Sequence, residues 1–145
     1  MTDLLVDCGN TRLKWRLQKH GVVQSSGAMS VNDVNLAQLQ ASLPNTVSAL
    51  YWASVAGDEL GLCIAAWAQQ NNTPCQQITT QDHFHNLSNG YQHPQQLGVD
   101  RWLAMVAARQ HTRKAVCVVD FGSAITFDYV NPEGQHEGSY IMPGA

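Results

Sequence analysis

The chain has 145 residues, of which 44% are hydrophobic and 13% charged, enough for one ordinary domain with a real core. Its formal net charge of −3 argues against nucleic-acid binding, which needs a basic face. No apolar run is long enough to cross a bilayer, and the N-terminus has no signal-peptide pattern, so we expect no membrane partner.

The cysteines favour a cytoplasmic protein with reduced thiols. The four of them, Cys8, Cys63, Cys75 and Cys117, form no Cys-x-x-Cys pair. Cys8 lies between Asp7 and Gly9, where a nucleophilic role is conceivable. A side chain that points into the core is the better interpretation, because the residue ends an apolar, strand-like run.

Hydrophobic periodicity predicts an alternation of strands and helices. A Gly-Asn pair between the first two strands indicates a tight hairpin turn. The polar, Gly- and Pro-rich stretch over 83–97 predicts a loop. In chain order we expect strands over 3–9, 11–18 and 22–29, a helix over 31–43, a strand over 47–55, a helix over 57–70, a strand over 75–79, that loop, a helix over 98–111, and strands over 115–121, 124–130 and 135–142.

This order predicts an α/β protein with one complete lobe and part of another. Residues 1–113 read β-β-β-α-β-α-β-α, a full layered unit, whereas 114–145 give three strands and no helix to cover them. A sheet with one apolar face must bury that face. We therefore expect this chain to be the N-terminal piece of a longer protein.

One motif occurs twice. An apolar run, then Asp-x-Gly, then a small polar residue and a second β-prone run appear around Asp7 and again around Asp120. Self-similarity at domain scale points to a duplicated unit, with two lobes facing a nucleotide. Either copy alone is as readily explained as a plain turn, but two copies in register make that interpretation weaker.

The first copy carries the chemistry that phosphates require. A glycine turn brings backbone N–H groups close to an anion, and Asn10 and Thr11 add side-chain donors. Lys14 adds a cation. Asp7, at the end of a strand, offers carboxylate oxygens to Mg²⁺, directly or through water.

Four segments, taken together, resemble the type III pantothenate kinases, a family in the superfamily of acetate and sugar kinases, Hsp70 and actin. The resemblance implies an actin-like ATPase (ribonuclease H-like) fold. The segments stand in the family's order and span most of the chain. They are Asp7-Cys8-Gly9-Asn10-Thr11-Arg12-Leu13-Lys14-Trp15, Tyr91-Gln92-His93-Pro94-Gln95-Gln96-Leu97-Gly98-Val99-Asp100-Arg101-Trp102, Asp120-Phe121-Gly122-Ser123-Ala124-Ile125-Thr126, and Gly138-Ser139-Tyr140-Ile141-Met142-Pro143-Gly144.

The resemblance also implies roles for single residues. ATP and its phosphates map to Asp7, Gly9, Asn10, Thr11, Lys14, Gly122 and Ser123. The pantothenate site maps to Tyr91, Gly98, Val99, Asp100 and Arg101, with Asp100 as the proton acceptor. A monovalent cation, K⁺ or NH₄⁺, maps to the Asp120 carboxylate, and Mg²⁺ to Asp7.

Two positions depart from the family pattern. Ser123 stands where the family usually has threonine, which keeps the hydroxyl and loses a methyl group. Ser139 stands where the family usually has a second glycine, and it adds a side chain.

Asp100 also has a simpler interpretation. It lies in the first turn of the helix expected over 98–111, where the helix dipole favours a carboxylate by about 0.3–1 kcal/mol. Such a carboxylate is a weak base. Phosphoryl transfer tolerates a weak base, because its transition state is loose and the nucleophile mainly needs orientation.

For the remaining side chains, the sequence leaves the role undecided or argues against a functional one. Arg101 could pair with an anionic substrate group, hold Asp100, or face solvent. His83 and His85 suggest a metal site, but their only acidic neighbour at ligand spacing is Asp82, so zinc binding is disfavoured.

The resemblance implies an enzyme that phosphorylates pantothenate with Mg-ATP, the first step of coenzyme A synthesis, as a cytoplasmic homodimer with a monovalent cation. Two alternatives remain. One is a regulatory relative like the Bvg-accessory-factor proteins of the same family. The other is an inactive fragment that only binds ligand.

Overall fold

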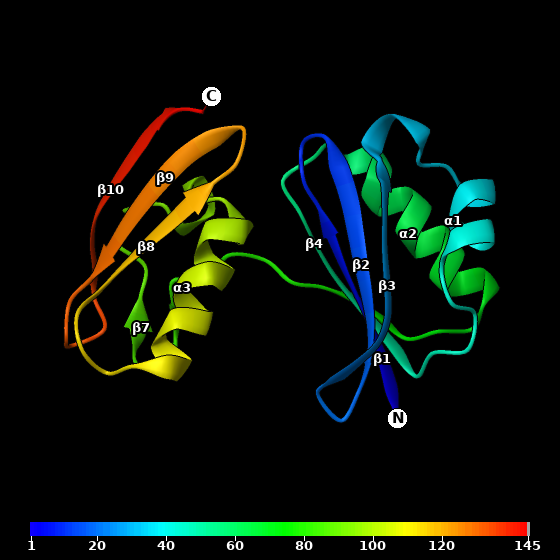
Figure 1. Ribbon diagram of the computed structural model, residues 1–145, viewed down its shortest axis with the longest axis horizontal. Coiled ribbons are helices and arrows are strands. Elements are labelled where there is room, and N and C mark those ends of the chain that lie inside the picture. Colours follow the sequence, from blue (N-terminus) through cyan, green and yellow to red (C-terminus); the bar gives the residue numbers. More distant parts are fainter. Residues whose placement is uncertain (145) are drawn as a thin grey trace. The chain divides into compact units, whose positions relative to one another are not determined.

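The computed structural model describes residues 1–144, and they form an α/β fold with three sheets and three α-helices (Figure 1). The chain divides into two compact units, Met1–Ile78 and Thr79–Ala145. The predicted lobe boundary at residue 113 is not this boundary, because the helix before it packs on the strands after it. That lobe division stays a prediction about the whole protein.

The first unit is built on a five-stranded mixed sheet in the order β3-β2-β1-β4-β5. The first three strands form an antiparallel meander, and β4 and β5 run parallel to β1. The strands are β1 (Thr2–Cys8), β2 (Arg12–Lys19), β3 (Val22–Ser30), β4 (Ala49–Ser54) and β5 (Cys75–Gln77).

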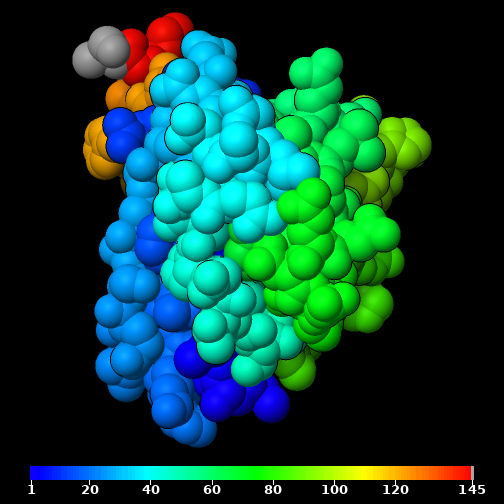
Figure 2. Space-filling view, turned by 90° about the vertical axis from the view of Figure 1, so that its right-hand side faces the viewer, coloured from blue at the N-terminus to red at the C-terminus, as the bar shows by residue number. Residues whose placement is uncertain are grey.

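Two helices, α1 (Leu36–Ser42) and α2 (Asp58–Gln70), cover one face of this sheet. Figure 2 views the molecule from their side, with α1 in cyan and α2 in green. Alternate residues of β1 point into the core, which explains why Leu4, Val6 and Cys8 are buried while Asp7 is exposed. Trp67 of α2 is fully buried in the same core.

The second unit has a three-stranded antiparallel sheet in the order β10-β9-β8 with one helix packed on it. Its elements are the hairpin strands β6 (His83–Phe84) and β7 (Leu87–Ser88), α3 (Val99–His111), β8 (Val116–Phe121), β9 (Ala124–Val130) and β10 (His136–Pro143). Trp102 and Met105 of α3 form a core with Leu87, Leu97 and Val130.

Two predicted elements were wrong. The stretch over 83–97 is not simply a loop, because it holds the β6–β7 hairpin and a 3-10 turn, Pro94–Gln96. The helix expected over 31–43 is instead a 3-10 turn, Val31–Asp33, followed by α1. Two capping side chains explain the break: Ser30 accepts from the amide of Asn32, and Asn35 accepts from the amide of Gln38.

The remaining strands and helices begin and end close to the predicted residues. Within residues 1–144, no helix is long and apolar enough to cross a membrane.

Candidate active site

The first Asp-x-Gly turn lies between β1 and β2 in the first unit. The Gly9 amide donates to the Arg12 carbonyl at 2.9 Å, and a Cβ at Gly9 would lie 3.3 Å from that oxygen, so the turn is tight. Asn10 and Thr11 are exposed at its tip. From the sequence we expect these two side chains to be donors to phosphate, and that role stays a prediction.

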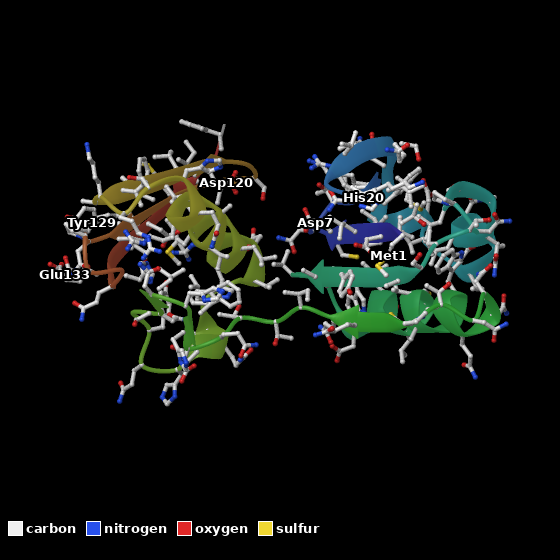
Figure 3. The ribbon with its side chains drawn as sticks, turned by 90° about the horizontal axis from the view of Figure 1, so that it is seen from below. Met1, Asp7, His20, Asp120, Tyr129 and Glu133 are labelled. Carbon is white, nitrogen blue, oxygen red and sulfur yellow. The ribbon has the colours of Figure 1, made fainter. Side chains whose placement is uncertain are left out.

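Asp7 and Lys14 lie directly opposite each other in the β1–β2 ladder. Cross-strand partners point to the same side of a sheet, here the side away from the helices. Figure 3 labels Asp7 near the end of its strand. The turn therefore combines a carboxylate, a cation and polar side chains within a few residues.

Cys8, beside them, is not suited to nucleophilic chemistry. Its side chain is completely buried, and burial, with a smaller contribution from the Asp7 charge, raises the pKa of the thiol to about 11. Because the thiolate is the reactive form, the interpretation of Cys8 as a core residue is the one that the structure supports.

In the second unit, Arg101 forms a buried ion pair with Asp128. The Arg101 Nε lies 2.9 Å from Oδ2 of Asp128, and Nη2 lies 2.6 Å from Oδ1, a bidentate geometry. Only 8% of the Arg101 side chain and 2% of the Asp128 side chain is exposed. Arg101 therefore does not face solvent, and its guanidinium does not hold Asp100.

His136 supplies a further hydrogen bond to Asp128. The Gly90 amide donates to Nδ1 of His136 at 3.3 Å, so Nδ1 carries no proton. The proton then sits on Nε2, which donates to Oδ1 of Asp128 at 2.9 Å. Gly90 has to be glycine here, because a Cβ would lie 2.0 Å from the His136 carbonyl oxygen.

These hydrogen bonds decide the charge state of the pair. Burial by itself raises the pKa of Asp128, but the hydrogen bonds from His136 and Arg101 and the Arg101 charge outweigh it, so the pKa is lowered. The bond to Asp128 likewise raises the pKa of Arg101. The pair is therefore ionised at neutral pH.

Tyr91 is held by the same group of residues. Its hydroxyl lies 3.1 Å from Oγ of Ser139 and 3.4 Å from Nη1 of Arg101, and its ring stacks on His136 with centroids 5.9 Å apart. The Ser139 bond, more than any other contact, lowers the pKa of Tyr91. The serine that departs from the family pattern thus contacts the predicted substrate tyrosine.

Asp100 lies in the first turn of α3, immediately after buried Val99, with Gly98 as the N-cap residue. Its Oδ1 accepts from the backbone amide of Arg101 at 2.9 Å, and the residue is exposed. The carboxylate is therefore anchored at one oxygen and open to solvent. This geometry suits a group that accepts a hydrogen bond from a bound hydroxyl.

The second Asp-x-Gly turn joins β8 and β9. Asp120 lies opposite Thr126 rather than a lysine, and Figure 3 shows it at the end of the sheet away from Glu133. The Gly144 amide donates to the Ser123 carbonyl at 3.1 Å, and a Cβ at Gly144 would lie 2.6 Å from the Gly122 carbonyl oxygen. The last Pro-Gly segment therefore packs directly on this turn.

The predicted site residues fall into two groups. Those for ATP phosphates around Asp7 belong to the first unit, and those from Tyr91 to Ser123 belong to the second. Sequence reasoning missed Asp128 and His136. A signal existed for Asp128: it is the only acidic residue among the alternate positions of β9 that face α3.

Two solved structures share this fold. One, from Campylobacter jejuni, is described as a candidate Baf family transcriptional activator; it is 23% identical, with a TM-score of 0.58 over 97% of this chain and 54% of its own. The other, a candidate 2-dehydro-3-deoxygalactonokinase from Sinorhizobium meliloti, is 14% identical, with a TM-score of 0.57 over 95% of this chain and 52% of its own. The actin-like ATPase and sugar kinase fold is thereby confirmed.

Sequence comparison defines the family. The model of the type III pantothenate kinase family matches residues 3–145. Relatives named type III pantothenate kinase from Nitrosococcus oceani, Marinobacter nauticus and Pseudomonas aeruginosa are 33%, 36% and 35% identical over 97% of this chain. The chain spans 56%, 58% and 58% of their lengths, a little over half. The chain belongs to the type III pantothenate kinase family.

Proposed function

We propose that this chain carries the phosphate turn and the substrate segment of an ATP-dependent pantothenate kinase. The enzyme transfers the γ-phosphoryl group of ATP to the primary hydroxyl of pantothenate and forms 4'-phosphopantothenate, the first step of coenzyme A synthesis. We further propose that it works in the cytoplasm as a homodimer and uses a monovalent cation.

The observation that carries this proposal is that, in a chain of this family, the side chains of the substrate segment are held in defined positions by hydrogen bonds. Tyr91 and Arg101 are both held in place by Asp128, His136 and Ser139 rather than left mobile. Nη1 of Arg101 makes one long bond to Tyr91, and Nε and Nη2 are engaged by Asp128. A fixed guanidinium and a fixed phenol are suited to orienting a small anionic substrate.

Asp100 then acts as the proton acceptor. Its free oxygen accepts a hydrogen bond from the substrate hydroxyl and orients it, while the other oxygen stays on the Arg101 amide. The proton moves to the carboxylate late, as the bond to phosphorus forms, because the transition state is loose. Gly98 and Val99 shape the backbone that presents Asp100.

The phosphate groups are assigned to the first turn, with Gly9, Asn10 and Thr11 as donors and Lys14 as the cation. Mg²⁺ in such sites is typically held by one or two carboxylates plus substrate phosphates, so the single exposed carboxylate of Asp7 fits the donor set. When bound, Mg²⁺ neutralises charge on the phosphates. Asp120 is assigned to the monovalent cation, and Gly122 and Ser123 to the nucleotide.

Two other functions stay as candidates. A regulatory role is favoured by the fold shared with the Campylobacter jejuni protein, whose description is that of a transcriptional activator. The other candidate is an inactive form that only binds ligand. The carboxylates Asp7, Asp100 and Asp120 favour the enzyme over the regulator.

The test is an assay of phosphoryl transfer from ATP to pantothenate, with and without K⁺, by this chain and by a protein of the relatives' full length. Asp100→Asn should lower kcat by about 100-fold or more and leave the KM for ATP nearly unchanged, because orientation and proton transfer are lost. Asp82→Asn, an exposed carboxylate of the same unit, is the matched control. Normal turnover in Asp100→Asn contradicts the assigned role, and no transfer by either protein contradicts the enzyme.

A further inference from the structure

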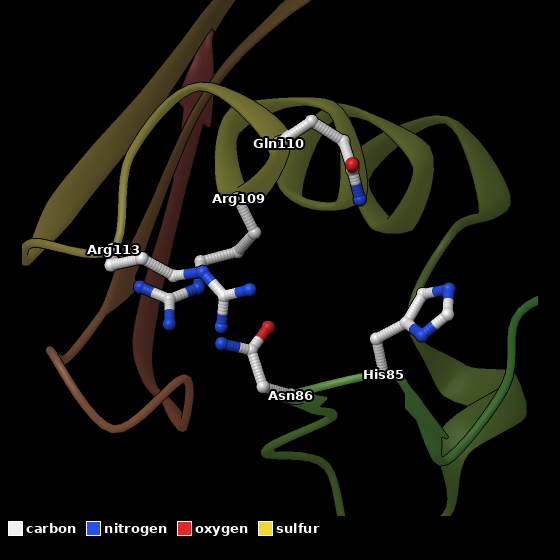
Figure 4. Close-up of a pocket in the computed structure, with 5 residues that line it drawn as sticks. All are labelled: His85, Asn86, Arg109, Gln110 and Arg113. Atoms are coloured by element: carbon white, nitrogen blue, oxygen red, sulfur yellow. The ribbon is translucent and has the colours of Figure 1, made fainter.

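A pocket of about 470 Å³ lies in the second unit, and its lining includes none of the residues assigned above. Figure 4 shows its lining, which comes from the β6–β7 turn (His85, Asn86) and from the end of α3 and the residues after it (Arg109, Gln110, Arg113). Its volume is in the range of small-molecule sites. Every lining side chain carries an N–H donor, and none is acidic.

Arg109 is unusual because its guanidinium is buried without a carboxylate. Only 4% of the residue is exposed. Nη1 and Nη2 make long bonds of 3.3 and 3.4 Å to the carbonyls of Lys114 and Pro132, and the buried Nε has no hydrogen-bond partner. A basic residue in the last helical turn suits the helix dipole, but the dipole does not explain a buried, unpaired charge.

A second guanidinium converges on the first. With the Asn86 amide turned over from the orientation in Figure 4, its oxygen accepts from Nη2 of Arg109 at 2.9 Å and from Nη1 of Arg113 at 2.5 Å. In residues 1–144, neither arginine forms an ion pair with a carboxylate. The two guanidinium charges, which share one neutral oxygen, repel each other. A bound anion would attract both and so offset that repulsion.

The walls of the pocket are fixed by backbone contacts. The Ser88 amide donates to the Gly134 carbonyl at 2.8 Å, and Ser88 also forms a bridge with Gln135. Gly134 has φ +87°, and a Cβ there would lie 1.6 Å from the Asn86 carbonyl oxygen. The hairpin that carries His85 and Asn86 is therefore tied closely to the β9–β10 turn, so the donors are held in place.

We propose that this pocket binds the phosphate group of a small anionic ligand. Two guanidinium groups provide paired N–H donors that match phosphate oxygens, and the amide of Gln110 and the ring of His85 add further donors. The pocket is larger than a phosphate ion, which favours an organic phosphate over free phosphate. Nothing in this site takes part in the proposed phosphoryl transfer.

The test is a titration of the ¹⁵N-labelled chain, followed by amide chemical shifts at constant ionic strength, with inorganic phosphate, glycerol 3-phosphate and glycerol as separate probes. We expect phosphate-dependent shifts at His85, Asn86, Gln110 and Arg113, resolved from any shifts at the Asn10 turn. Arg113→Gln should weaken binding about tenfold or more, because one charged donor is lost. Arg16→Gln, an exposed arginine of the first unit, is the matched control and should bind normally.

Gln110→Glu is a second variant, since it places a negative charge at the rim without removing an arginine, and it should abolish the shifts. Tighter binding of glycerol 3-phosphate than of phosphate identifies an organic phosphate, and equal binding identifies free phosphate. The proposal is overturned if neither phosphate probe moves these amides at about 10 mM, a concentration that detects even weak binding. It is also overturned if Arg113→Gln binds as well as the unchanged chain. Neither result depends on kinase activity.

Discussion

The two Asp-x-Gly turns share a motif and differ in what surrounds it. Asp7 has Lys14 opposite it across the ladder, whereas Asp120 has Thr126. The residue after each aspartate also differs: Cys8 is completely buried and Phe121 is 78% exposed. The same turn therefore places a carboxylate opposite a lysine in one unit and opposite a threonine in the other. The difference lies in the cross-strand partner and in which face of the sheet a helix covers.

The two units also differ in how their interiors are built. The first has an apolar core between its sheet and two helices. The second buries an ion pair, Arg101–Asp128, beside a smaller apolar cluster. A buried pair is costly to break, because one partner is left as an uncompensated charge. The stability of the second unit should therefore depend on a few polar contacts.

The largest expected effect comes from Asp128→Asn, which should lower the free energy of unfolding of the second unit by about 3–5 kcal/mol, because Arg101 stays buried without its partner. Chemical denaturation measures it. Asp82→Asn, an exposed carboxylate of the same unit, should leave unfolding unchanged. If both variants unfold alike, the two interiors do not differ in the way described.

The Asp128 carboxylate should also make the stability of the second unit depend on pH. Because its pKa is lowered on folding, the stabilisation from Asp128 is fully present above its unfolded value near 3.8, and it is lost as pH falls through the lower folded value. Acid unfolding of the unchanged chain should show this loss. Asp128→Asn should show a weaker dependence in that range.

The second effect concerns the thiols. The rise in the pKa of Cys8 from 9.0 to about 11 lowers its thiolate fraction about 100-fold near pH 8. The Cys8 side chain is also buried, whereas Cys117 is exposed on β8. Mass spectrometry of maleimide labelling should find Cys117 modified at least about 100-fold faster. In denaturant the two rates should become similar. Equal rates in the folded chain would contradict the burial of Cys8.

The third effect tests the cross-strand lysine. If the first turn binds the phosphates of ATP as proposed, Lys14→Gln should weaken ATP binding roughly 10- to 100-fold, because a charged hydrogen bond to phosphate would be lost. Lys19→Gln, an exposed lysine at the far end of the same strand, is the control. Calorimetry on the chain measures both. Unchanged affinity in Lys14→Gln would remove the main chemical difference between the two turns.

The smallest effect concerns Ser139. Ser139→Ala should raise the pKa of Tyr91 toward its ordinary value, because the hydrogen bond that contributes most to lowering it is removed. An ultraviolet titration against a Tyr91→Phe reference measures this. If Tyr91 also contacts the substrate, the KM for pantothenate should change by a factor of about two to five, within the energy of one neutral hydrogen bond.

Much of the fold follows from periodicity. The strands of the first unit were predicted one by one, because apolar or β-prone runs mark them and the Gly-Asn pair indicates the first turn. The β6–β7 hairpin was not predicted, since its strands have two residues each and its turn depends on His85 at φ +52°. Strands this short have too few residues to show a hydrophobic pattern, so they cannot be recognised among the polar residues around them.

The sequence could name candidate site residues that stand in contiguous motifs, and it missed those that are joined to them only by tertiary contacts. Asp100 and Arg101 were found together on the chain. The partner of Arg101 is 27 residues away on β9, and the partner of Tyr91 is 48 residues away on β10. No local spacing encodes such a pairing, and a lone aspartate in a strand has several simpler explanations.

Gly90 is not among the predicted site residues, yet two of its features are needed where it meets His136. Its amide fixes the tautomer of His136, and its missing side chain lets the His136 carbonyl approach. In a library of random substitutions, position 90 should therefore tolerate as little change as the residues assigned to chemistry. Selection for activity would mark it as essential, although it has no chemical role of its own.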